Sequence, residues 1–123
     1  MTSSQLQERL ICFAAAIIEF SNYITNNQAG LTLKDQMTRS GISSALNYGE
    51  AIGAESPRDF IHKMQILLKE LRETWVALRI ADKSNLHSNP ERYTYLLDEN
   101  NQLISIFTKS ITTNKTKIIR TKI

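Results

Sequence analysis

The sequence is poor in the residues that build disulfides and metal sites. Cys12 is its single cysteine, so no internal disulfide can form and nothing indicates an oxidising compartment. His62 and His87 are its two histidines, and with Cys12 they make no metal-ligand spacing. We therefore expect no metal and no cofactor, and we interpret both histidines as surface residues.

Long hydrophobic runs are also missing. No apolar stretch approaches the roughly 20 residues that a membrane-spanning helix needs. The opening MTSSQLQERL has no basic segment before its apolar stretch, so we expect no secretory signal and a cytoplasmic location, without membrane contact. A chain of 123 residues is long enough to bury the core of one domain without disulfides or a bound metal.

Signatures of catalysis are absent as well. The chain has no glycine-rich phosphate loop, no nucleophile elbow and no paired catalytic carboxylates. Glu70 and Glu73 lie three residues apart, but no Glu-x-x-His motif follows, which argues against a di-iron bundle. We expect the protein not to be an enzyme.

Acidic residues are missing from the C-terminal segment, which changes the meaning of the net charge of +3. Residues 1–111 hold 11 of the 15 basic residues and all 12 acidic ones, a net charge of −1. The segment 112–123 supplies the excess through Lys115, Lys117, Arg120 and Lys122. These four cations could bind nucleic-acid phosphates, or they could form a solvated end that keeps the protein soluble.

Helical periodicity is what the sequence has in quantity. Apolar residues recur at alternating spacings of 4 and 3 from Leu6 to Ile24 and from Phe60 to Leu78, and a similar pattern runs from Tyr93 to Ile111. Ser56-Pro57 and Asn89-Pro90 are typical helix starts. With a further helix beginning between Thr32 and Asp35 and running to about Ala54, residues 1–111 are predicted to form an all-α, antiparallel up-and-down four-helix bundle.

Other features extend this interpretation. Residues 112–123 are expected to be a flexible, disordered tail or a short strand paired with a neighbour. A second apolar line, Ile11, Ala14 and Ile18, widens the first helix, as expected either for a subunit contact or for a helix between two others. Tyr48 and Trp75 are interpreted as core or subunit-interface residues.

The stretch from Gln36 to Glu73 carries the most distinctive polar pattern. At 100° per residue, five polar residues of the second helix fall within about 80° of one another, provided that the helix is unbroken at Gly41 and Gly49. The members of this polar stripe are Gln36, Arg39, Ser43, Asn47 and Glu50.

The polar stripe resembles the hallmark of the bacterial rRNA intervening-sequence proteins, roughly Q-x-R-R-x-x-x-S-x-x-x-N-x-x-E-G. Ser56, Phe60 and Glu73 follow at plausible positions, whereas Thr38, Ala45 and Ala51 depart from the pattern. The resemblance implies a non-enzymatic four-helix bundle that forms a homopentamer and binds RNA or DNA. A related group serves as accessory proteins of retroelement reverse transcriptases, so a protein adaptor or scaffold is the alternative.

Two interpretations of the polar stripe follow. It could be a surface that binds a ligand or nucleic acid, or a set of hydrogen bonds that holds the helices together inside the bundle. Arg39 and Glu50 lie about 16 Å apart along the helix and cannot pair with each other. Glu73, expected to be partly buried, is a candidate partner for Arg39 in an ion pair that would fix the register of two helices.

Overall fold

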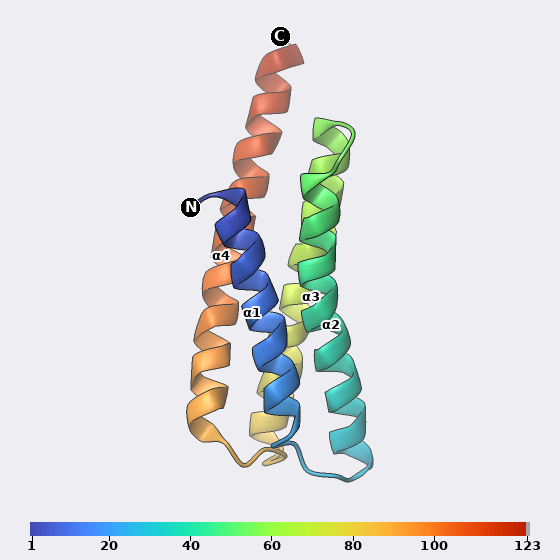
Figure 1. The fold of residues 1–123 in the computed structure, drawn as a ribbon, viewed down its shortest axis with the longest axis vertical. Coiled ribbons are helices and arrows are strands. Elements are labelled where there is room, and N and C mark those ends of the chain that lie inside the picture. The colour runs from blue at the N-terminus through green and yellow to red at the C-terminus, as the bar shows by residue number, and fades with distance from the viewer. Residues whose placement is uncertain (123) are drawn as a thin grey trace.

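Four α-helices run alternately up and down in a bundle (Figure 1). The computed structural model describes residues 1–122, and side chains as far as Arg120. The helices are α1 Ser3–Ser21, α2 Gln28–Ile52, α3 Pro57–Lys83 and α4 Pro90–Lys122. Each helix packs against the next one along the chain, and α4 packs against α1. The predicted all-α, antiparallel four-helix bundle is confirmed.

Side chains ahead of each helix satisfy the first free backbone amides. Thr2 forms a capping box with Gln5, and Ser56 accepts a hydrogen bond from the Asp59 amide ahead of Pro57. Asn27 accepts from the amide of Gly30 at 2.8 Å, so α2 begins at Gln28. The predicted start between Thr32 and Asp35 is therefore wrong, because the Asn27 cap begins the helix earlier.

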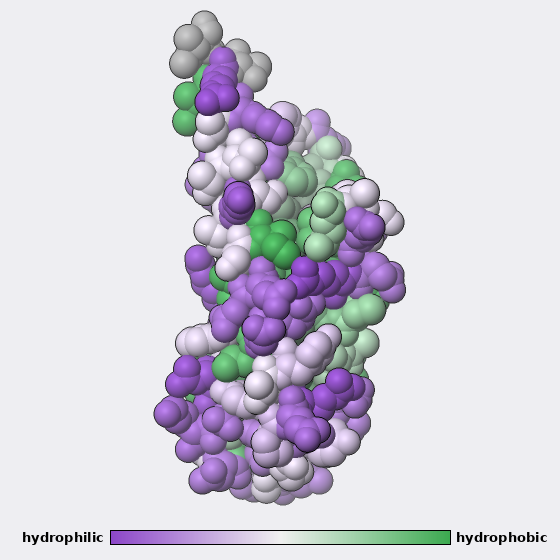
Figure 2. Space-filling model, turned by 90° about the vertical axis from the view of Figure 1, so that its left-hand side faces the viewer, coloured by the Kyte–Doolittle hydropathy of each residue, from purple (hydrophilic) through white to green (hydrophobic). Residues whose placement is uncertain are grey.

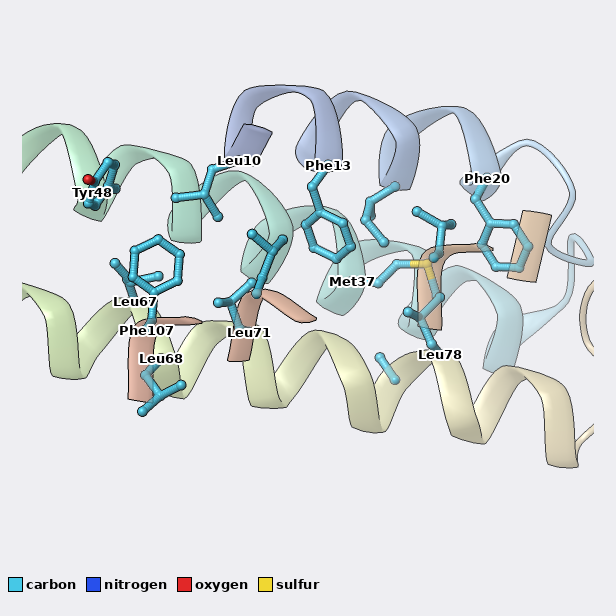
Figure 3. Packing of buried hydrophobic residues seen from close by; sticks show 14 of the residues in the cluster. Leu10, Phe13, Phe20, Met37, Tyr48, Leu67, Leu68, Leu71, Leu78 and Phe107 are labelled. Atoms are coloured by element: carbon cyan, nitrogen blue, oxygen red, sulfur yellow. The ribbon is translucent and has the colours of Figure 1, made fainter. Parts of the chain in front are cut away.

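Large side chains from all four helices fill the core. Phe13 and Phe20 of α1, Met37 of α2, Leu71 of α3 and Phe107 of α4 are all buried, and Figure 3 shows Phe13, Met37 and Leu71 directed into the space between the helices. This packing is possible because each helix places its apolar residues on one face.

Helix α2 contributes small residues to the same interior, and it is unbroken as predicted. A Cβ atom built on Gly41 would lie 3.4 Å from the Ile17 side chain, so α1 approaches the backbone of α2 closely. Ser40 Oγ and Thr74 Oγ1 lie 2.6 Å apart in a buried hydrogen bond between α2 and α3. Small side chains therefore let α2 pack closely against both neighbours.

Asn100 links α4 to the backbone of α3. Its side chain is fully buried, and in the amide orientation that satisfies both groups its nitrogen donates to the Leu71 carbonyl oxygen and its oxygen accepts from the Trp75 backbone nitrogen, both at 3.0 Å. Tyr48 is buried, as expected for a core residue, whereas Trp75 is half-buried.

The two loops at one end of the bundle are bonded to each other. The Thr25 amide donates to the Leu86 carbonyl at 2.8 Å, and the Ser88 amide donates to the Tyr23 carbonyl at 3.0 Å. The prediction of a surface His87 is wrong, because only 5% of its side chain is exposed. The ring packs between Phe20 and Tyr93. Loop pairing, which the periodicity of the helices does not encode, buries this histidine.

The C-terminal segment is helical. Helix α4 continues through residues 112–122 and extends past the other helices (Figure 1), so the expected disordered tail or short strand is wrong for these residues. Ile111 is buried and Ile118 packs against the core, which supports the additional turns. Residue 123 lies outside the described residues. Over residues 1–122, no helix is long and apolar enough to cross a membrane.

Replacing glycine by alanine should have opposite effects on the free energy of unfolding at two positions of α2. A Cβ atom at Gly30 would overlap the Thr25 backbone carbonyl, whereas one at Gly49 would lie 3.6 Å from the flexible end of Gln7, an ordinary contact. Gly30→Ala should therefore lower the free energy of unfolding by about 1–3 kcal/mol through overpacking. Gly49→Ala should raise it by up to about 1 kcal/mol through helix propensity. Urea unfolding measures both, and a Gly30→Ala protein as stable as the wild type would contradict this structure of the turn.

Candidate binding surfaces

The polar stripe lies on the side of α2 that faces α3, at the surface of the bundle. Gln36, Arg39 and Glu50 are exposed, and Ser43 and Asn47 are half-buried. Asn47 donates its side-chain amide to the Ser43 carbonyl at 2.8 Å and to the Ser43 hydroxyl at 3.0 Å, both within α2. The stripe therefore shares one side of an unbroken helix, as predicted, but its members are not deeply buried.

Arg39 does not pair with Glu73. Its guanidinium lies 2.6 Å from Asp35, one turn earlier on α2, and both side chains are 66% exposed. Glu73 is also exposed, contrary to the expected partial burial. The proposed ion pair between α2 and α3 is wrong, because Arg39 points away from the seam to a carboxylate on its own helix.

Glu50 makes the stripe's contact with α3. Its carboxylate lies 3.1 Å from Lys63 Nζ. At the opposite end of the same seam, Gln36 and Glu73 line an open groove of about 600 Å³ whose apolar wall includes Val76 and Ile80. Stripe residues therefore border the α2–α3 seam at both of its ends.

Glu70, at this seam, has a pKa that its surroundings shift. Desolvation by burial, followed by repulsion from Glu73 and a hydrogen bond with it, raises the pKa of Glu70 above its ordinary value. Lys69 and Arg39 oppose this shift. Sequence spacing had identified Glu70 only as a neighbour of Glu73.

The C-terminal cations lie along the last turns of α4. Lys115, Lys117 and Arg120 have exposed side chains, and the backbone of Lys122 is helical while its side chain lies outside the described residues. Lys115 lines a surface hollow together with Gln65 and Arg72 of α3. The end of α4 is thus joined to a basic surface on α3. Figure 2 shows the mostly hydrophilic side of the molecule that α4 forms and the protruding end of this helix.

A row of cations on α3 was not identified from the sequence. Its members point away from the core within a sector of about 80° that contains no acidic residue of α3. We call them the α3 cation row: Arg58, Lys69, Arg72, Arg79 and Lys83. Arg79 is half-buried and the other four are exposed. The seven-residue spacing of Arg72 and Arg79 was the available signal.

The α3 cation row is not neutralised by ion pairs. Among the side chains of residues 1–120, no row member lies within ion-pair distance of a carboxylate. Two cations on the opposite side of the bundle are paired: Arg9 contacts Glu99 at 2.6 Å, and Arg92 contacts Glu19 at 2.9 Å. These two pairs join α1 to α4, so positive charge on that side of the bundle is balanced.

Where α1 and α2 meet, the outer surface is apolar. Ile11 and Ile18 of α1 are each 47% exposed, and Ile42 and Leu46 of α2 are 39% and 64% exposed. Ile18 and Ile42 directly follow the residues of the close Ile17–Gly41 contact, which places them on neighbouring parts of the surface. We call these four residues the α1–α2 apolar surface. Adjacent exposed apolar side chains are typical of protein interaction sites.

Metal ligands do not gather anywhere in the described part of the chain. No group of three or more His, Cys, Asp or Glu side chains there could hold a metal ion. Cys12 is exposed and His62 is exposed, the latter as predicted.

Comparison with models of protein families shows which family this chain belongs to. The family model described as "23S rRNA-intervening sequence protein" matches residues 3–109. The chain belongs to that family. The match includes α1, α2 and α3 and ends within α4, before Lys115.

A solved structure supports the same assignment. The protein is similar to a Bacteroides thetaiotaomicron protein, described as having unknown function and belonging to the S23 ribosomal protein family. The two chains are 27% identical, with a TM-score of 0.81, over 91% of this chain and 99% of the other. The comparison with curated proteins gave no match. The resemblance carried by the polar stripe is therefore confirmed at the level of the 23S rRNA-intervening sequence protein family.

The raised pKa of Glu70 predicts a pH-dependent stability difference. In the folded protein this carboxyl keeps its proton to a higher pH than in the unfolded chain, so its favourable contribution is full below the unfolded pKa and is lost as pH rises through the folded pKa. Glu70→Gln should therefore melt at a higher temperature than the wild type at pH 7, and the difference should shrink towards about pH 4.

Thermal melts at pH 4 and pH 7 measure this effect, with the exposed Glu55→Gln as the matched control. The control substitution should change the free energy of unfolding by no more than about 0.5 kcal/mol at either pH. A Glu70→Gln protein that is less stable than the wild type at pH 7 would contradict the assigned environment.

Proposed function

We propose that this protein is a non-enzymatic, homo-oligomeric bundle that binds RNA or DNA through its basic surface. The observation that carries the proposal is the set of cations on α3 and at the end of α4, where Lys115 adjoins Arg72. The α3 cation row, which forms no ion pair among the side chains of residues 1–120, can attract phosphates and release the counterions that surround nucleic acid. The name of the family, which refers to an intervening sequence in 23S rRNA, agrees with an RNA ligand.

Self-association is the second part of this proposal. The α1–α2 apolar surface offers a second copy of the chain a contact that removes apolar side chains from water. Small residues beneath it, such as Gly41, let the two helices lie close together. By resemblance to the family, the assembly would be a pentamer, which would place five basic surfaces in one particle and strengthen binding through multivalency.

An adaptor that binds another protein is the alternative function. The α1–α2 apolar surface favours it, because the same four side chains could contact a partner such as a retroelement reverse transcriptase. In that case nucleic acid would be held by the partner, and the purified protein would bind RNA weakly.

Binding of a fluorescently labelled RNA hairpin tests the proposed function. Fluorescence anisotropy between 50 and 200 mM salt should give micromolar binding at the low end. The dissociation constant should rise by about 100-fold or more across the series, because several phosphate contacts each add to the salt slope. If the purified protein does not bind at 10 μM and low salt, nucleic-acid binding is rejected and the adaptor is favoured.

A substitution in the apolar surface tests self-association. Leu46→Asp places a charge at the most exposed residue of the proposed contact, so the mass measured by light scattering should fall from about five times 14.0 kDa to 14.0 kDa. Ile119→Asp, at an exposed apolar residue near the end of α4, is the control and should leave the mass unchanged. A wild-type protein that is monomeric at 100 μM would reject the oligomer.

A further inference from the structure

The spacing of the α3 cation row suggests which form of nucleic acid it binds. The row extends about 37 Å from Arg58 to Lys83 at 1.5 Å per residue. Its charges fall into three groups: Arg58 alone, Lys69 with Arg72, and Arg79 with Lys83. The centres of successive groups are about 16–19 Å apart along α3.

A double helix has a matching repeat. One turn of B-form DNA is about 34–36 Å long, and a rod lying along a duplex crosses both phosphate backbones within it, so crossings recur at an average of roughly 17 Å, alternating across the wide major and the narrow minor groove. Three groups of cations at intervals of about 16–19 Å can therefore contact three successive backbone crossings. A flexible single strand has no such fixed spacing.

The same surface offers no free aromatic ring for base stacking. The Arg79 guanidinium lies over the Trp75 ring, 5.3 Å from its centre, and the indole nitrogen of Trp75 is buried. Phe60, the other aromatic residue of α3, is half-buried. Proteins that bind single strands use exposed aromatic rings as stacking platforms, whereas contacts to a duplex backbone require only positive charge.

We infer that the outward face of α3 is a docking surface for the phosphate backbone of double-helical nucleic acid. Its cations contact successive backbone crossings and leave the bases unread. The inference rests on the proposed function, because it assigns that function to one face of one helix and one form of ligand. Lys115, which lines a hollow with Arg72, extends the surface onto α4.

A matched pair of double variants tests this assignment. Lys69→Gln with Lys83→Gln removes two charges from the row, and Lys34→Gln with Lys109→Gln removes the same two charges from α2 and α4. Each protein is titrated against a 20-base-pair RNA duplex, a DNA duplex of the same length and an unstructured single-stranded RNA. The row variant should bind the DNA duplex, whose repeat matches the row, about tenfold or more weakly at 50 mM salt, with a salt slope lower by about 2.

The control variant should bind within about threefold of the wild type, and circular dichroism should show the same helicity for all three proteins. Wild-type protein that binds the single strand as tightly as either duplex overturns the inference. Equal loss in the two double variants, or a polyglutamate chain that competes as well as the duplex does, overturns it too. Each of these results leaves the proposed function standing, whereas a wild-type protein that binds none of the three nucleic acids rejects both.

Discussion

The close packing of α2 against its neighbours is the constraint on which the bundle depends. Gly41 leaves room for Ile17 of α1, and the small residues Ser40 and Thr74 meet in a buried hydrogen bond between α2 and α3. A larger residue at these positions would separate the helices, because a packed core absorbs added volume poorly. Asn100 adds a polar contact between α4 and the backbone of α3, so all four helices are held in one register.

This arrangement determines which charges remain available. At the α1–α4 seam, Arg9 and Arg92 contact carboxylates of the opposite helix, and at the α2–α3 seam Lys63 contacts Glu50. The α3 cation row forms no ion pair among the side chains of residues 1–120, although Lys69 and Arg72 line the groove that also contains Glu73. The α1–α2 apolar surface lies on another part of the bundle. Self-association and phosphate binding can therefore occur on separate surfaces.

Local signals predicted the bundle well. Alternating spacings of 4 and 3 gave the apolar faces of the helices, and Ser56-Pro57 and Asn89-Pro90 gave two of the helix starts. The position of His87 could not be predicted, because pairing between two loops distant in sequence buries it. The last turns of α4 were missed for a similar reason: Ile118 packs on a core formed by other helices, which overrides the β-branched composition of that segment. The α3 cation row was overlooked because whole-chain charge counts do not show which faces acids occupy.

Lysine footprinting tests the central claim, that the outward face of α3 contacts double-helical nucleic acid, most directly. The protein is treated with an acetylating reagent alone and with a saturating DNA duplex, and the modification of each lysine is quantified by mass spectrometry. The account predicts that the duplex protects Lys69 and Lys83 while Lys34 and Lys109 react equally with and without it. Protection confined to Lys34 and Lys109, or unchanged reactivity of Lys69 and Lys83 in the saturated complex, would contradict it.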